Sequence, residues 1–363
     1  MTVQFRKRKI DSIATEACSV FDVNNDGFMD IVSGEYWYEG PDFVRKHKIC
    51  TLPVTHETHD DFCDYPMDVD GDGYVDIITG GWFKKALQWR KNPGPAGGEW
   101  TTYDIDLCGN VETIRFLDID GCGVPELFPN TPNGPQAFYK LVRDAAGTPQ
   151  GRFTKHVIGA APISGHGLGF ADINGDGRLD ILLRDGWLEQ PDNPFDTPWT
   201  FHPEFSFGKH ASIPILGCDV TGNGLCDLIV GQAHSYGLHW YEQGIDADGR
   251  RSWIQHEIDS TVSQYHDLQL VDLDLDGVPE LISGKRYRAH NDGDPGAADP
   301  VGLYYFKIDG GRFEKHTIDF GQAGECSGAG IYFWTHDLTG NGYPDIVAPG
   351  KEGLFLFENL GKA

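Results

Sequence analysis

The sequence has no long apolar run, no closely paired cysteines and few basic residues. No stretch approaches the roughly 20 consecutive apolar residues that a membrane-spanning helix needs. The segment from Met1 to Asp22 is basic but lacks the apolar core of a signal peptide, so we expect a cytoplasmic protein. The 8 cysteines contain no CxxC pair, which argues against a zinc ribbon or a thioredoxin-like motif. We interpret them as reduced, mostly packing residues.

Basic residues are outnumbered by acidic ones. Lys and Arg number 29 and Asp and Glu 55, so the 363 residues carry a formal net charge of −26. Binding to a phosphate backbone needs clustered cations, so we expect no nucleic-acid partner, and we expect no membrane partner either. The hydrophobic content of 39% and the aromatic content of 12% are too high for a disordered chain. The sequence therefore predicts a globular protein, with its oligomeric state left open.

What the chain has in abundance is a short repeat. One motif occurs seven times, with first aspartates 46 to 65 residues apart: DVNNDGFMDIVSG from Asp22, DVDGDGYVDIITG from Asp68, DIDGCGVPELFPN from Asp118, DINGDGRLDILLR from Asp172, DVTGNGLCDLIVG from Asp219, DLDLDGVPELISG from Asp272 and DLTGNGYPDIVAP from Asp337. Each copy joins a glycine turn to an apolar triplet of β-forming residues, which indicates a β-hairpin. Long helical patterns are absent, so the fold class predicted is all-β.

Two further apolar segments accompany each hairpin. An aromatic residue or valine followed five residues later by isoleucine precedes the motif, and a segment such as GLHWYEQ or GLFLFEN follows it. Four short strands in each unit of about 40 to 50 residues are typical of a β-propeller blade. The chain opens with the strand that its last unit lacks, so Val3 to Ile10 is expected to complete that blade. Residues 1–363 are thus predicted to form a single domain, a closed seven-bladed β-propeller.

The hairpins also carry a family resemblance. Their D-x-[DN]-x-[DN]-G-x-x-[DE] pattern resembles the FG-GAP or VCBS repeats of integrin-type and related propellers. The resemblance covers essentially the whole chain and implies a propeller fold. It implies little about function, because one fold hosts many chemistries.

The acidic hairpins have two interpretations. Alternating carboxylates around a glycine turn can wrap a hard cation such as calcium, and the spacing resembles the start of an EF-hand loop. Alternatively, Asp and Asn side chains cap their own turn by accepting backbone N–H bonds. Three copies are weakened as calcium sites by Cys122, Thr221 and Thr339. The four intact candidate sets are Asp22, Asn24, Asp26 and Asp30; Asp68, Asp70, Asp72 and Asp76; Asp172, Asn174, Asp176 and Asp180; and Asp272, Asp274, Asp276 and Glu280.

Histidines are concentrated on the opposite rim of the predicted ring. Seven of the 14 fall in loops expected to open there, namely His56, His59, His166, His210, His234, His266 and His290. Counting back six residues from the repeat aspartate reaches Glu16, Glu112, His166 and His266, so these side chains should lie at one depth around a central channel. Several imidazoles with a carboxylate suit zinc, manganese or iron, whereas magnesium would rely on carboxylates. The predicted metal ligands are His166, His234, His266 and, as a weaker fourth, Glu112.

Other reactive and aromatic residues are expected on the same rim. The segments HETHDDFCDYP, GQAHSYGLHW and GKRYRAHNDGDPGAADP contain acids, imidazoles and cations, and tryptophans provide walls. Such a combination describes a carbohydrate pocket better than a protein-binding surface. The candidate catalytic residues are Asp61, Tyr236, Lys285, Arg286 and His290, and the candidate substrate-binding residues are Trp82, Trp187, Tyr287 and Trp334.

Four segments carry a second resemblance. GHGLGFADINGDG, AHSYGLHWYEQ, SQYHDLQLVDLDLDG and GKRYRAHNDGDPG resemble the propeller module of the aldos-2-ulose dehydratases, which remove water from keto-sugars. The resemblance implies a metal-assisted β-elimination from a keto-sugar such as 1,5-anhydrofructose, an aldos-2-ulose or a 3-keto-glycoside, but assigns no role to individual residues. Such a reaction needs a metal or cation at the carbonyl oxygen, a base and an acid. We assign the oxyanion to Lys285 or Arg286 and the proton transfers to His290, Tyr236 or Asp61.

Two other functions remain open. An oligosaccharide lyase acting on uronates would use similar chemistry, although its anionic substrate calls for more rim arginine than the sequence offers. A noncatalytic propeller that binds a sugar or a protein is the third hypothesis. An adhesin of that type should carry an export signal, and the rim histidines exceed what binding alone requires.

Overall fold

The computed structural model describes the whole chain except residues 1, 56, 133, 163–165 and 363. Within this part, regular structure is almost entirely β-strand, with one short 3-10 turn, η1 (Gly94–Ala96). None of the helical structure described is long or apolar enough to cross a membrane. The all-β prediction is therefore confirmed.

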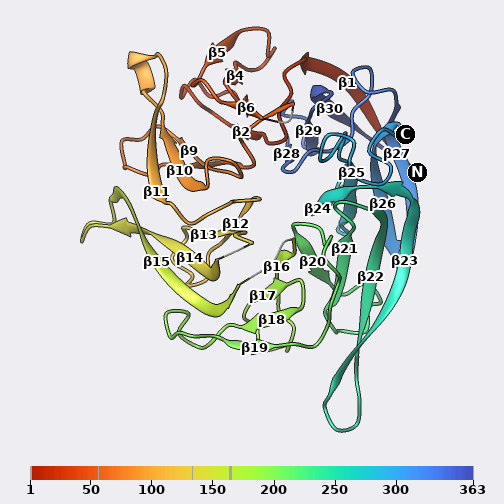
Figure 1. Cartoon of the computed structure of the whole chain (residues 1–363). Helices are drawn as coiled ribbons and strands as arrows, with labels where there is room; N and C mark the ends of the chain where they lie inside the picture. Colours follow the sequence, from red (N-terminus) through yellow and green to blue (C-terminus); the bar gives the residue numbers. More distant parts are fainter. Residues whose placement is uncertain (1, 56, 133, 163–165, 363) are drawn as a thin grey trace.

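The strands of the described residues form five four-stranded sheets, one eight-stranded sheet and one two-stranded sheet. Figure 1 shows the sheets following one another in chain order around a common centre. The first three large sheets contain β2 (Ser19–Phe21), β3 (Asp30–Ser33), β4 (Tyr36–Tyr38) and β5 (Lys46–Lys48); β8 (Asp64–Met67), β9 (Asp76–Gly81), β10 (Ala86–Lys91) and β11 (Thr101–Asp106); and β12 (Ile114–Leu117), β13 (Glu126–Pro129), β14 (Pro135–Arg143) and β15 (Pro149–Pro162). The small sheet pairs β6 (Val54–Thr55) with β7 (Thr58–His59).

The eight-stranded sheet is two groups of four joined by parallel pairing of β16 with β20. Its strands are β16 (Leu168–Ala171), β17 (Asp180–Leu183), β18 (Gly186–Glu189), β19 (Thr200–His202), β20 (Ile215–Cys218), β21 (Asp227–Gly231), β22 (Tyr236–Ile245) and β23 (Arg251–Ser263). The remaining sheets contain β24 (Tyr265–Val271), β25 (Glu280–Lys285), β26 (Val301–Asp309) and β27 (Arg312–Gly321), and β28 (Trp334–His336), β29 (Asp345–Gly350) and β30 (Gly353–Lys362) together with β1 (Val3–Asp11).

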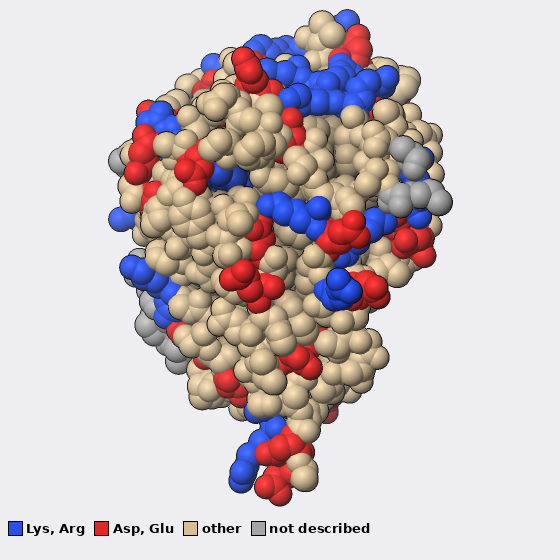
Figure 2. Space-filling view, turned by 90° about the vertical axis from the view of Figure 1, so that its right-hand side faces the viewer, with Lys and Arg blue, Asp and Glu red and all other residues tan. Residues whose placement is uncertain are grey.

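The first strand pairs with the last one. β1 runs antiparallel to β30, from the pair Val3 and Lys362 to the pair Asp11 and Leu354. The sequence predicted this pairing, because the last repeat lacks the strand with which the chain begins. Ion pairs reinforce this junction, because Arg6 binds Glu358 of β30 and the Lys7 ammonium lies 3.0 Å from Asp319 of β27. Figure 2 shows basic side chains gathered toward the top of this side of the molecule, with acidic ones scattered below them.

The acidic hairpins owe their shape to carboxylates that accept backbone N–H bonds. Asp22 accepts bonds from Asp26 N and Gly27 N, and Gly27 has the left-handed φ of 90° that favours glycine. Asp30, eight residues after Asp22, accepts bonds from Val23 N and from Gly40 N, so it ties the turn to the end of β4. The repeated aspartates therefore cap the turns, as one of the two interpretations predicted.

The same bonds recur in the other candidate calcium hairpins. Asp76 and Asp180 each accept two backbone N–H bonds, and Glu280 accepts one. In two hairpins a lysine lies among the remaining carboxylates. Lys91 pairs with Asp70 and Asp72, and Lys307 with Asp274, where an ammonium and a calcium ion would compete for the same oxygens. Calcium binding stays a prediction.

Aromatic residues of the third strands pack against histidines of the outer strands. The ring centroids of Trp187 and His202 are 4.2 Å apart, and those of Trp240 and His256 are 4.3 Å apart. His202 also contacts Glu189 at 2.8 Å. Trp187 has no exposed surface and belongs to a hydrophobic cluster between neighbouring strands. The prediction that Trp187 forms a pocket wall is therefore wrong, because its ring is part of the core.

A buried acid in the turn between β29 and β30 should make stability depend on pH. Glu352 accepts one bond from Gly328 N, and burial raises its pKa to about 7. Since this value lies above the unfolded one of roughly 4.5, the carboxyl favours folding fully below about pH 4.5, and this advantage is lost as pH rises through 7. Glu352→Gln should therefore gain stability relative to the wild type as pH rises across that window, by up to about 3 kcal/mol.

Urea unfolding of both proteins at pH 5 and pH 8 measures this difference. Glu325→Gln, at an exposed residue, is the matched control, and its stability relative to the wild type should be the same at both pH values. An equal stability of Glu352→Gln and wild type at pH 8 would contradict the assignment of a raised pKa.

Candidate functional site

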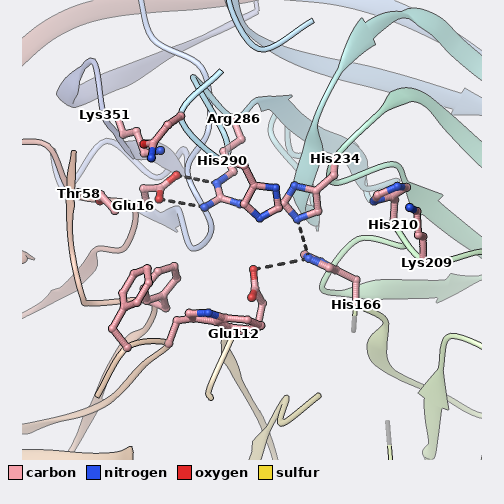
Figure 3. Close-up of a pocket in the computed structure, with 14 residues that line it drawn as sticks. Glu16, Thr58, Glu112, His166, Lys209, His210, His234, Arg286, His290 and Lys351 are labelled. Carbon is pink, nitrogen blue, oxygen red and sulfur yellow. Dashed lines mark hydrogen bonds and ion pairs between the residues drawn. The ribbon is translucent and has the colours of Figure 1, made fainter. Parts of the chain in front are cut away.

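A pocket of about 440 Å³ lies at the end of the innermost strands that faces away from the acidic hairpins. β24 illustrates the arrangement, because it begins beside His266 and ends directly before the hairpin aspartate Asp272. Figure 3 shows side chains from several sheets converging on this pocket. Its lining consists of Glu16, Thr58, Phe62, Trp82, Phe83, Glu112, His166, Lys209, His210, His234, Arg286, His290, Asn291 and Lys351.

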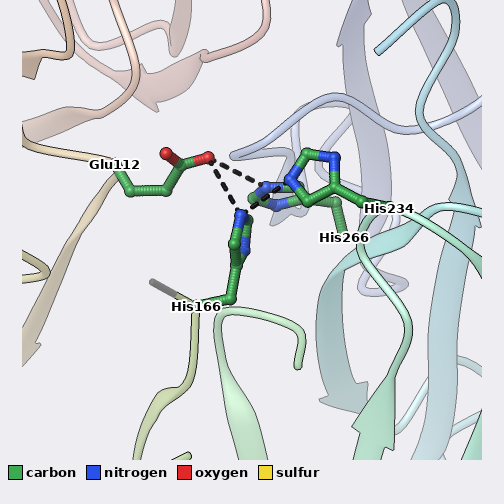
Figure 4. A group of neighbouring side chains, drawn as sticks. All are labelled: Glu112, His166, His234 and His266. Atoms are coloured by element: carbon green, nitrogen blue, oxygen red, sulfur yellow. Dashed lines mark hydrogen bonds and ion pairs between the residues drawn. The ribbon is translucent and has the colours of Figure 1, made fainter. Parts of the chain in front are cut away.

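Four potential metal ligands form a cluster, and three of them, Glu112, His166 and His234, line this pocket. The ligand atoms of Glu112, His166, His234 and His266 all lie within 4.8 Å of one another, and all four residues are buried (Figure 4). His234 Nε2 is 2.7 Å from His166 Nε2, and Glu112 Oε1 is 3.3 Å from His266 Nε2 and 3.7 Å from His166 Nε2. The structure thus brings together all the residues predicted as metal ligands.

The geometry and chemistry of this cluster fit a transition metal. A tetrahedral ion with bonds of roughly 2.0–2.1 Å places its ligand atoms about 3.3 Å apart, which falls within the range of 2.7 to 3.7 Å found here. Burial lowers the pKa of His166 to about 4 and that of His234 to about 2, although Glu112 and Asp294 respectively oppose the shift. Burial also lowers the pKa of His266 well below its usual value. The three imidazoles are therefore neutral at pH 7, the form in which nitrogen can bind a metal.

His290 lies on the open side of the cluster. Its ring stacks on that of His234 with centroids 4.3 Å apart and planes 9° apart. Asp294 contacts both rings, through His234 Nδ1 at 2.7 Å and His290 Nδ1 at 3.0 Å. Burial raises the pKa of Asp294, but the bonds from the two histidines outweigh it and lower the pKa to about 2. A polar histidine thus faces the pocket directly beside the potential metal site.

Arg286 offers a further polar group to the pocket. Its Nε donates to Glu16 Oε1 at 2.7 Å and one terminal nitrogen donates to Glu16 Oε2 at 3.1 Å. Burial lowers the pKa of Arg286, but the Glu16 carboxylate outweighs it and raises the pKa, so the guanidinium stays charged. The other terminal nitrogen, Nη1, is buried and has no hydrogen-bond partner among the described residues. This nitrogen can therefore donate to an oxygen atom of a ligand.

Three predicted catalytic residues lie away from the pocket lining. Asp61 is buried and binds Arg90, so it is not available for proton transfer with a ligand. The Lys285 ammonium donates to Ser263, Gln264 and the carbonyl of Gly296. Its three hydrogen bonds are thus made within the protein. Tyr236 is exposed and donates to Asp299 at 2.6 Å. The placement of Asp61, Lys285 and Tyr236 in the site was wrong, because each is committed to a partner elsewhere.

Of the aromatic residues predicted to bind substrate, some line the pocket and others do not. Trp82 lines the pocket, whereas Tyr287 is not among its lining residues. Trp334 lines a different cavity of about 450 Å³, together with Tyr65 and Phe116. Trp334 lies three residues before the hairpin aspartate Asp337, so its cavity is nearer the acidic turns. The prediction that Trp334 lines the same pocket as Trp82 is therefore wrong.

The sequence analysis did not identify two lysines that line the pocket. Of the other histidines expected on this rim, one lines the pocket. Lys209 and Lys351 line the pocket. Lys351 lies in the connection that follows the second strand of its repeat. The equivalent connections contain Trp82 and His234, so the repeat could have identified Lys351 as a residue of the site. His210 lines the pocket, His59 binds the carbonyl of Ala14 at 3.0 Å, and His56 lies outside the described residues.

Comparison with known proteins places the chain by its fold. No family model and no curated protein sequence matches it. Among solved structures, the rhamnogalacturonan lyase YesW shares 14% identity over 96% of this chain and 72% of its own, with a TM-score of 0.50. Saccharomyces cerevisiae Sqt1 shares 11% identity over 99% of this chain and 98% of its own, also with a TM-score of 0.50. The likeness is one of fold.

Proposed function

We propose that this chain is a cytoplasmic, seven-bladed β-propeller of the FG-GAP or VCBS type that acts as a metal-dependent carbon–oxygen lyase on a keto-sugar. The observation that carries the proposal is the convergence of Glu112, His166, His234 and His266 beside His290 and Arg286. The arrangement of the sheets around a common centre and the pairing of β1 with β30 support the propeller. The pocket volume suits a small carbohydrate.

The residues have complementary roles in β-elimination. A divalent ion held by the three imidazoles and Glu112 would act as a Lewis acid that stabilises negative charge on the substrate carbonyl oxygen. Arg286 Nη1 donates a hydrogen bond to the same oxygen. His290 takes the proton from the carbon next to the carbonyl, and the electron pair forms the enolate. As the enolate collapses, the β carbon–oxygen bond breaks, and the departing oxygen receives the proton from His290.

A direct assay tests this proposal. Purified, dialysed protein should contain a stoichiometric transition metal and convert 1,5-anhydrofructose or a 3-keto-glucoside to an enone that absorbs in the ultraviolet. EDTA should abolish the activity, and added metal should restore it. A protein that contains only calcium and shows no turnover would contradict the lyase and favour a noncatalytic propeller that binds a sugar or a protein.

One observation favours the uronate lyase as a second candidate. Lys209 and Lys351 line the pocket without an ion pair to an acidic side chain among the described residues, in a chain of net charge −26. Together with Arg286 they supply the cations that an anionic sugar requires. A uronate oligosaccharide in the same ultraviolet assay distinguishes the two substrates, since elimination next to a carboxylate also creates a conjugated double bond.

A further inference from the structure

The segment between β25 and β26, residues 286–300, forms a strap over one side of the pocket. Arg288, His290, Asn291 and Asp292 have positive φ angles of 46°, 50°, 53° and 66°, a conformation that is uncommon outside glycine. Such a run persists only where surrounding contacts hold it, and it is found most often at functional sites.

Several contacts anchor the strap to the sheets. Lys351 Nζ donates to the carbonyl of Arg288 at 2.8 Å, and Gln264 Nε2 donates to that of Pro295 at 3.2 Å. Lys285 Nζ donates to the carbonyl of Gly296 at 2.5 Å. These bonds fix the segment on both sides of Asp294, so the position of this carboxylate is set by the fold.

Asp294 accepts hydrogen bonds from two histidines that have different roles in the proposed site. Its Oδ2 binds His234, one of the potential metal ligands, and its Oδ1 binds His290, which faces the pocket. By contrast, the Nδ1 atoms of His166 and His266 are buried without a hydrogen-bond partner among the described residues. Of the three clustered imidazoles, His234 is thus the one whose second nitrogen is held by a carboxylate.

The bonds to Asp294 decide where the proton lies on each ring. An ionised carboxylate only accepts hydrogen bonds, so both Nδ1 atoms must carry hydrogen. In the neutral form an imidazole has a single N–H, so a ring that carries hydrogen on Nδ1 has a lone pair on Nε2. For His234 this lone pair points toward the cluster, since its Nε2 lies 2.7 Å from His166 Nε2. For His290 it belongs to a ring that lines the pocket.

We infer that Asp294 is a positioning residue that prepares two groups at once, His234 as a metal ligand and His290 as the base that receives the substrate proton. The roles of ligand and base rest on the proposed function, whereas the shared tautomer does not. A single carboxylate on the strap therefore couples metal binding to proton transfer.

The tautomers can be measured without metal or substrate. In the full-length protein, nitrogen-15 chemical shifts of His234 and His290 should report hydrogen on Nδ1 in both rings. In Asp294→Asn the amide can accept from one ring but presents an N–H to the other, so one histidine should switch to the Nε2–H form. Hydrogen on Nε2 of either ring in the wild type would overturn the inference, whatever the enzyme assay shows.

The functional consequence has its own readouts. Asp294→Asn should weaken binding of Co²⁺ or Zn²⁺ by roughly 10- to 100-fold, the usual cost of losing the partner of a metal-bound histidine. It should lower kcat by about 10²-fold or more, since a wrongly protonated imidazole cannot act as base. His290→Ala should lower kcat and leave metal affinity unchanged.

A matched control lies on the same strap. Asp299 accepts from Tyr236 and touches neither histidine, so Asp299→Asn should change neither metal affinity nor kcat. If Asp294→Asn keeps both values at wild-type level, or if Asp299→Asn loses them equally, Asp294 has no positioning role. Thermal unfolding of each variant shows whether a loss of metal reflects a loss of fold.

Discussion

Replacing His266 with alanine is expected to remove the metal and the activity together. The ring has no exposed surface, and its Nε2 lies 3.3 Å from Glu112 Oε1. Without it, three ligands would remain at a site whose geometry suits four. Metal affinity should fall by more than the roughly 10- to 100-fold that loss of a supporting hydrogen bond costs, and turnover should fall below detection.

Two comparisons separate this effect from unfolding. Glu112→Gln keeps the size of the side chain and removes the negative charge, so it should weaken metal binding without creating a cavity. His256→Ala removes a histidine of the outer strand β23 that binds Glu242 at 2.9 Å, packs on Trp240 and is not one of the clustered ligands. It should retain stoichiometric metal by elemental analysis. Stoichiometric metal in folded His266→Ala would show that this histidine is not a ligand.

The repeat made the cluster predictable from sequence. Glu112, His166 and His266 stand at the same distance before their hairpin aspartates, His266 in β24 and the other two just before β12 and β16, so the repeat places them at similar depth. Strand geometry therefore carries the register from one repeat to the next. His234 joins them from the connection between a second and a third strand, the other class of loop that opens on this side.

Other positions could not be assigned, because their roles depend on partners distant in sequence. Lys285 directly precedes Arg286, yet its ammonium is turned to Gly296 while Arg286 faces Glu16. Trp187 occupies a third strand, where the repeated stack with an outer-strand histidine buries the ring. Alternation along a strand is visible in sequence, but the neighbour that covers each side is not.

The second large effect is expected at the buried pair of Asp61 and Arg90. Substitutions there show whether the Asp61 carboxylate has a structural or a catalytic role. Arg90 donates to Asp61 Oδ1 at 3.0 Å and to Asp64 Oδ1 at 3.3 Å, and all three side chains are 0–1% exposed. Thr79 also donates to Asp61 at 2.8 Å. One cation therefore serves two buried acids. Burial and the neighbouring Asp61 charge raise the pKa of Asp64 well above its usual value, against the opposing effect of Arg90.

Arg90→Met is expected to destabilise the protein by about 3–5 kcal/mol, the usual cost of leaving buried charge unpaired. Asp61→Asn should cost much less, because it leaves Arg90 paired with Asp64 and keeps the shape of the side chain. Urea unfolding measures both values. A smaller loss for Arg90→Met than for Asp61→Asn would contradict this account of the charge balance.

Turnover of the folded variants then separates the two roles. Asp61 is enclosed with Arg90 and does not line the pocket, so Asp61→Asn should retain kcat and KM within about threefold. His290→Ala, assayed beside it, should lose kcat, because His290 faces the pocket. A loss of kcat in Asp61→Asn at unchanged stability would return Asp61 to the proton-transfer role, and the pocket would then have to open toward Arg90 during the reaction.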